Sequence, residues 1–160
     1  MRLGILPLGR ATFDVAFAAE KLDAILADLD ASGHDIIGSR GLLTGPNETA
    51  AALDELSASD IDHLLILQVT FTDAATSVAV ANALTCPVSI WAVPEPRLGG
   101  RLRLNAFCGL NLASHALGLH GRSFSWIYAD GGALVPGQLE KLFNDKPKWG
   151  EEPEPTAGEV

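Results

Sequence analysis

The stretch HLLILQVTF, residues 63–71, is the clearest strand pattern in the chain. Its apolar run is nearly continuous, which is typical of a parallel strand that helices cover on both faces. Parallel strands need helical crossovers between them. We therefore expect helices and further short strands on both sides of this stretch.

The flanking sequence meets this expectation. Four more apolar runs predict strands at residues 2–8, 35–38, 88–93 and 123–129. Segments with helical periodicity separate them, and their expected starts are Thr12 or Asp14, Asn47, Thr72 or Asp73, a position near Leu104, and Pro136. The alternation predicts an α/β three-layer sandwich with a five-stranded, mainly parallel sheet. A flavodoxin-like strand order, 2-1-3-4-5, fits five strands best.

The α/β domain is expected to occupy residues 1–143. Residues 144–160 hold three prolines and four glutamates and few residues that can pack, so we expect an acidic, disordered tail. Trp149 lies in this tail. It is either an incidental exposed side chain or a group that docks on a partner.

Composition and charge exclude several classes of function. The formal net charge of −9 makes nucleic acid and anionic membranes poor partners. The apolar runs are too short to span a bilayer, and Pro7 and Gly9 interrupt the apolar N-terminus. We therefore expect a cytoplasmic protein without a signal peptide. Cys86 and Cys108 lie among apolar residues and are expected to be small buried thiols.

Polar side chains follow the expected strands at the edge where open α/β sheets bind ligands. Arg10 follows the first strand, and Gln68 interrupts the apolar run of the third. The loop at residues 94–103, PEPRLGGRLR, combines two glycines, Glu95 and three arginines, and the helix after it carries Asn105. Such a loop is expected to hold something polar, either a ligand or a subunit contact.

Several of these side chains allow two interpretations. The Gln68 amide either faces a ligand or bonds to neighbouring backbone, because a buried amide without partners costs about 1–3 kcal/mol. The Arg10 guanidinium either binds a carboxylate, phosphate or sugar, or pairs with Asp14 or an acid on a neighbouring loop. Asn111 and His115 share a helix face, which lies either at a subunit seam or site or, for the histidine, in the core.

Common catalytic motifs are missing from the sequence. It contains no G-x-G-x-x-G after the first strand, no P-loop lysine and no G-x-S-x-G elbow. No His, Asp and Glu cluster has metal-ligand spacing, so we predict no metal site in this chain. The carboxylates near the sheet edge are candidates for acid–base work, but no spacing fixes a pair, and the catalytic residues stay unassigned. His34, His63 and His120 are expected at the surface.

Four segments together resemble the amino-terminal region of the L-fucose isomerase/L-arabinose isomerase superfamily, especially its shorter L-fucose isomerase-like members. They read PLGRATFD (7–14), QVTFTDA (68–74), WAVPEPRLGGRLRLNAFCGLNLASHAL (91–117) and FSWIYAD (124–130), and in this order they span roughly residues 2–130. Such enzymes interconvert aldoses and ketoses by proton transfer through an enediol on a divalent metal, usually Mn²⁺. Their amino-terminal α/β domain helps to close a sugar site, commonly that of a neighbouring subunit.

The resemblance implies substrate-binding roles for Arg10, Gln68, Trp91, Glu95, Arg97 and Asn105. In such enzymes the metal ligands and the acid–base groups come from a later and larger part of the chain. We therefore expect no cofactor in this chain, and Mn²⁺ or another divalent metal only in a partner catalytic portion.

Three functions are compatible with these observations. The first is the sugar-binding subunit of an isomerase-like enzyme, either a homo-oligomer or a hetero-oligomer with a metal-binding catalytic subunit. The second is a stand-alone, non-catalytic carbohydrate-binding or scaffold module. The third is a homo-oligomeric enzyme of different chemistry, built from the arginine loops and the carboxylates.

Overall fold

The computed structural model describes residues 1–96 and 99–144. Its strands are β1 (Arg2–Leu8), β2 (Asp35–Gly38), β3 (His63–Gln68), β4 (Val88–Ala92) and β5 (Phe124–Tyr128). Its helices are α1 (Val15–Ala31), α2 (Pro46–Ala58), α3 (Ala75–Ala83), α4 (Ala106–Leu119) and α5 (Gln138–Asn144). Strands and helices alternate throughout, which confirms the predicted α/β class.

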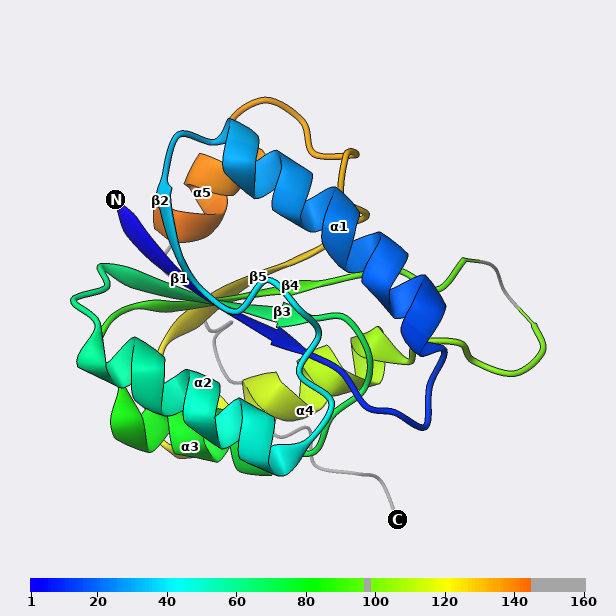
Figure 1. The fold of residues 1–160 in the computed structure, drawn as a ribbon, viewed down its shortest axis with the longest axis horizontal. Coiled ribbons are helices and arrows are strands. Elements are labelled where there is room, and N and C mark those ends of the chain that lie inside the picture. The colour runs from blue at the N-terminus through cyan, green and yellow to red at the C-terminus, as the bar shows by residue number, and fades with distance from the viewer. Residues whose placement is uncertain (97–98, 145–160) are drawn as a thin grey trace, which may run out of the picture.

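The five strands form one sheet in the order β2-β1-β3-β4-β5, and every neighbouring pair is parallel. This is the predicted strand order. Helices α1 and α5 cover one face, and α2, α3 and α4 cover the other (Figure 1). The chain therefore changes faces between β1 and β3, whose following helices lie on opposite sides of the sheet. Loops diverge at such a switch point and leave room for a ligand.

The core lies between the sheet and these two helical layers. All six residues of β3 are buried, as expected for the central strand of a parallel sheet. Helix α1 packs on the sheet through one stripe at helical spacing, made of Ala18, Leu22, Ile25, Leu26 and Leu29. β3 ends at Gln68, earlier than predicted, because the Phe71 amide leaves the sheet and donates to the Leu104 carbonyl at 2.8 Å.

The start of helix α2 differs from the prediction. Helix α2 begins at Pro46 with Gly45 as its N-cap, so Asn47 lies inside the first turn. The cap is built by the Glu48 carboxylate, which accepts the amides of Thr44 and Gly45 at 3.2 and 3.3 Å. Helix α1 starts as predicted, with the Asp14 carboxylate accepting the Phe17 amide at 3.1 Å.

His63 is buried, so its expected surface position is wrong. Its Nε2 atom lies 2.7 Å from the Ser89 hydroxyl, and its ring packs edge-on against Phe143 of α5. Ser89 in turn lies 2.7 Å from the Ser125 hydroxyl, which donates to the Leu142 carbonyl. This chain of contacts ties the end of α5 to β3, β4 and β5.

Acid is expected to weaken the fold through His63. Burial, followed by the nearby charge of His34, lowers the pKa of His63 to about 4 from its usual 6.5. Below pH 6.5 the unfolded chain binds a proton at His63, whereas the folded chain does so only near pH 4. The free energy of unfolding is therefore expected to fall by about 1–2 kcal/mol between pH 7 and pH 5 from this group. Urea unfolding at the two pH values measures it. His63→Gln should flatten the dependence, and an equal slope in that variant would contradict the assignment.

The structure also tests the expected burial of the two cysteines and of the polar residues on helix α4. Cys108 is exposed rather than buried, whereas Cys86 is half-buried. His115 is exposed, which rules out the core interpretation, and Asn111 on the same stripe is exposed too. No helix among residues 1–96 and 99–144 is long and apolar enough to cross a membrane. Of the predicted tail, Asn144 is the last residue of α5, whereas residues 145–160, including Trp149, lie outside the described residues.

Candidate functional site

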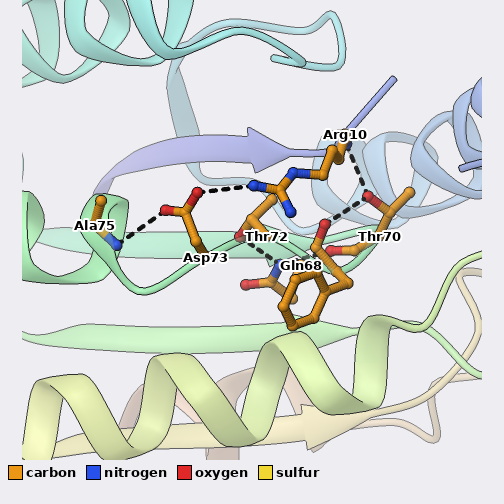
Figure 2. Close-up of polar contacts among 7 residues, drawn as sticks. Arg10, Gln68, Thr70, Thr72, Asp73 and Ala75 are labelled. Carbon is orange, nitrogen blue, oxygen red and sulfur yellow. Dashed lines mark hydrogen bonds and ion pairs between the residues drawn. The ribbon is translucent and has the colours of Figure 1, made fainter. Parts of the chain in front are cut away.

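Arg10 lies at the switch point and links the ends of β1 and β3. Its backbone amide donates to the Thr70 hydroxyl at 2.9 Å, and its guanidinium donates to the Asp73 carboxylate at 2.9 Å (Figure 2). The guanidinium carbon also lies 5.7 Å from the centroid of the Phe71 ring. The salt-bridge interpretation therefore holds, with Asp73 rather than Asp14 as the partner. The Arg10 side chain stays 42% exposed, so this charge is fixed in direction and open to a ligand.

Gln68 is buried at the end of β3. Its amide nitrogen donates to the Thr70 carbonyl at 2.6 Å and to the Thr72 hydroxyl at 2.9 Å (Figure 2). This matches the interpretation of a glutamine bonded to nearby backbone. Its amide oxygen, however, has no hydrogen-bond partner in the part of the chain that the structure describes. Gln68 thus retains one unused acceptor next to the switch point.

Gly109 of α4 makes room for Gln68. A Cβ atom at position 109 would lie 2.7 Å from the Gln68 amide nitrogen and 2.9 Å from its carboxamide carbon. Real Cβ atoms do not approach that closely, so a larger residue at position 109 would displace the Gln68 side chain from its observed position.

The Glu95 carboxylate binds backbone amides of the loop that follows β4. Its carboxylate accepts the amides of Arg103, Leu104 and Asn105 at 3.1, 2.8 and 2.5 Å. One side chain therefore fixes both the end of the loop and the entry to α4. Asn105, the N-cap of α4, has left-handed backbone angles with φ of 53°, and its side chain caps no amide. Asparagine tolerates this conformation better than most residues, and such outliers often lie at functional sites.

Arg103 ties the same loop to the start of α1. Its Nε and Nη2 atoms donate to Asp14 at 2.9 and 2.8 Å, and its guanidinium carbon lies 3.7 Å from the Phe17 ring centroid. The Phe17 amide, and then the Arg103 guanidinium, lower the pKa of Asp14. The Asp14 amide also donates to the Arg103 carbonyl at 3.1 Å. The loops after β1, β3 and β4 are thus joined into one polar edge.

A cleft of about 400 Å³ opens beside Arg10, between the ends of β1 and β3 and helices α2 and α3. Arg10 and Asp73 line it together with four threonines, Thr44, Thr49, Thr72 and Thr76. Thr44, Thr49 and Thr76 were not among the predicted site residues. No local pattern marks them, because α2 and α3 bring them together only after the crossovers are made. A smaller hollow of about 290 Å³ lies near Asp14 and Arg103.

The remaining predicted residues lie elsewhere. Trp91 is fully buried in β4, where its indole N–H donates to the Ala129 carbonyl at 2.9 Å. Arg97 lies outside the described residues. The structure therefore brings Arg10, Gln68, Glu95 and Asn105 to one edge of the sheet and places Trp91 beneath it.

The carboxylates near this edge already have partners. Asp14 and Asp73 face Arg103 and Arg10, Glu95 holds three amides, and Asp130 accepts the Lys21 ammonium at 2.5 Å. Among residues 1–96 and 99–144, no three His, Cys, Asp or Glu side chains gather as a metal-binding group. The described residues do not fit a Mn²⁺ site. What they offer is hydroxyls, amides and fixed guanidinium groups.

Comparison with known proteins gives one consistent family. Residues 4–133 match the model of the fucose/sulfoquinovose isomerase N-terminal domain. The chain is 32% identical to a sulfoquinovose isomerase of Priestia megaterium over 124 residues, which cover 78% of this chain and 28% of that protein. It is 32% identical to a sulfoquinovose isomerase of Alkalicoccus urumqiensis over 139 residues, 86% of this chain and 31% of that protein. No solved structure matches significantly.

The chain thus spans less than a third of the length of these curated relatives. The match begins within β1, extends past β5 and includes the loops that form the polar edge. This chain belongs to the fucose/sulfoquinovose isomerase family, and residues 4–133 are its N-terminal domain.

Proposed function

We propose that the domain is the sugar-binding part of an isomerase-like enzyme and that it takes an aldose with an anionic group, such as sulfoquinovose. The observation that carries this proposal is Arg10, a fixed and half-exposed guanidinium at the mouth of a threonine-lined cleft. A guanidinium suits a sulfonate, and hydroxyl side chains suit the hydroxyls of a sugar. The names of the relatives supply the sulfonated substrate.

The sugar is proposed to lie between Arg10 and Asn105. The half-buried Asn105 amide has no capping role, and the buried amide oxygen of Gln68 is an unused acceptor at the end of β3. Glu95 then acts as a positioning residue, because its carboxylate is already occupied by three amides. In this arrangement the chain binds and orients the sugar. A divalent metal and the acid–base groups would come from another polypeptide, in a homo- or hetero-oligomer, and that polypeptide would carry out the isomerisation.

Binding of sulfoquinovose to the purified chain tests this proposal. Isothermal titration calorimetry should find binding of sulfoquinovose that is stronger than binding of glucose, which lacks the sulfonate. Arg10→Ala is expected to weaken sulfoquinovose binding at least tenfold, because a hydrogen bond to a charged group is worth about 1.5–3 kcal/mol. Glucose binding should change much less.

Arg40→Ala is the matched control. Arg40 also forms an exposed ion pair, with Asp30 at 2.6 Å, but does not line the cleft. Equal effects of the two substitutions on affinity, or no binding of either sugar, would refute the proposal. Binding without any metal dependence, and without turnover when a catalytic partner is added, would favour the stand-alone carbohydrate-binding module.

A further inference from the structure

Four large apolar side chains lie exposed on helix α4 and the edge strand β5. Phe107 and Leu119 of α4 are 47% and 73% exposed, and Trp126 and Tyr128 of β5 are 54% and 37% exposed. Phe107 and Tyr128 contact each other edge-on, with ring centroids 5.1 Å apart. We call the surface formed by these four residues the α4–β5 face. Exposed apolar side chains on two neighbouring elements of a folded domain indicate an interaction site.

The two elements of this face contribute no charged side chain of their own. Helix α4 (AFCGLNLASHALGL) and strand β5 (FSWIY) contain no Asp, Glu, Lys or Arg, although such residues make up 19% of the chain. Strand β5 pairs with β4 on one side only within the described sheet. Proteins usually guard an edge strand with charges or proline against unwanted pairing. Strand β5 has neither in its own sequence, although Pro136 and Lys141 line a hollow beside Trp126. Its exposed aromatic rings are therefore open to a covering partner.

The face is continuous with the candidate site. Phe107 lies in the first turn of α4, just after Asn105, and Tyr128 is paired in register with Ala92 at the end of β4. The next residue, Ala129, accepts the Trp91 indole. A polypeptide seated on this face therefore reaches the polar edge. His115 and Asn111 lie exposed on the same helix and supply polar groups at the seam.

The chain length of the matched relatives indicates which polypeptide would cover the α4–β5 face. About 70% of each matched sulfoquinovose isomerase lies outside the segment that resembles this chain. In the proposed function that polypeptide supplies the metal and the acid–base groups, so it has to approach the sugar site of a domain like this one. We propose that the α4–β5 face is the docking surface for the catalytic remainder of such an isomerase, through an apolar, uncharged surface or an added strand on β5. This inference rests on the proposed function, since it names the partner of the same site.

The test joins the full chain in frame to the part of the Priestia megaterium relative that lies beyond the matched segment. Cys108 is exposed on α4 and reports on coverage, while Cys86 is half-buried and serves as the internal reference. Burial raises the pKa of the Cys86 thiol, which keeps its alkylation slow. Alkylation by N-ethylmaleimide, followed for each peptide by mass spectrometry, should be at least tenfold slower at Cys108 in the fusion than in the free chain.

Two substitutions that introduce a charge test whether the α4–β5 face makes the contact in the fusion. Trp126→Glu places a charge on the face and is expected to restore the free-chain rate at Cys108. Val15→Glu places the same charge at an exposed residue of α1, on the other side of the sheet, and should leave Cys108 protected. Circular dichroism of both variants checks that the fold is intact.

Several results would overturn the inference. They are an unprotected Cys108 in the fusion, protection that Trp126→Glu does not remove, and a fusion that only aggregates. A free chain that is dimeric by light scattering, with Cys108 already protected, would assign the face to a second copy instead. Sulfoquinovose binding by the free chain is measured separately and does not involve the α4–β5 face, so failure of the proposed function is distinguishable from failure of the docking surface.

Discussion

Trp91→Ala is expected to lower the free energy of unfolding by about 3–5 kcal/mol, the range for removal of a large buried aromatic side chain. Trp91 is fully buried in β4, so its loss leaves a cavity that the surrounding parallel strands cannot close. The Ala129 carbonyl also loses the indole hydrogen bond. Urea unfolding followed by far-ultraviolet circular dichroism measures the change.

Two further substitutions sharpen this prediction. Trp91→Phe keeps most of the volume but loses the hydrogen bond, and should cost about 1–2 kcal/mol. Trp126→Ala removes the same side chain from an exposed position and should cost less than about 1 kcal/mol. If Trp91→Ala instead kept normal stability and lost sugar binding, Trp91 would be a ligand contact rather than a support beneath the site.

Glu95→Ala is expected to destabilise the chain by about 2–4 kcal/mol, because three backbone amides lose a charged acceptor. Glu95→Gln should cost about 1–2 kcal/mol, since its NH₂ group faces an amide donor whichever way the side chain is turned. Urea unfolding measures both. Hydrogen exchange at the Leu104 and Asn105 amides reports the local effect and should accelerate in both variants.

The control for Glu95 is Glu55→Gln, which neutralises an exposed carboxylate of α2 and should leave stability and loop exchange unchanged. Sugar affinity separates positioning from direct contact. A positioning role predicts weaker sulfoquinovose binding together with faster exchange in the loop. Weaker binding with unchanged exchange at Leu104 and Asn105 would place Glu95 in contact with the sugar.

The fold was predictable because its main signals are local. The apolar run of β3 and the stripe on α1 follow from the residues themselves, and helical crossovers between parallel strands restrict the strand order. Helix starts were less predictable, because caps compete within a few residues. Glu48 and Gly45 define the start of α2, although Asn47 is intrinsically a good cap.

The site was predictable in place and not in detail. Strand-end positions brought Arg10, Gln68, Glu95 and Asn105 to one edge, as expected from the rule for open sheets. The hydrogen-bond partners of these residues depend on the folded geometry. The spacing of residues in the sequence therefore could not predict that Arg10 pairs with Asp73 or that the Glu95 carboxylate accepts three backbone amides.

Two wrong expectations concern burial rather than pattern. Cys108 lies among apolar neighbours in sequence, yet α4 turns that side away from the sheet. His63 begins the central strand, and α5 then covers it by packing Phe143 against its ring. In both cases the burial of the side chain depends on which other element packs against it. The sequence of a single helix or strand does not determine that.

The cross-tied loops of the polar edge have a consequence for how a ligand is received. Arg10, Glu95 and Arg103 connect the segments after β1, β3 and β4, so these segments lose their conformational freedom when the chain folds and not when a sugar arrives. A receptor organised in advance spends less entropy on association and changes shape little. Recognition at this edge is therefore expected to discriminate by fit: a sugar with one misplaced hydroxyl meets a surface that does not rearrange to accept it.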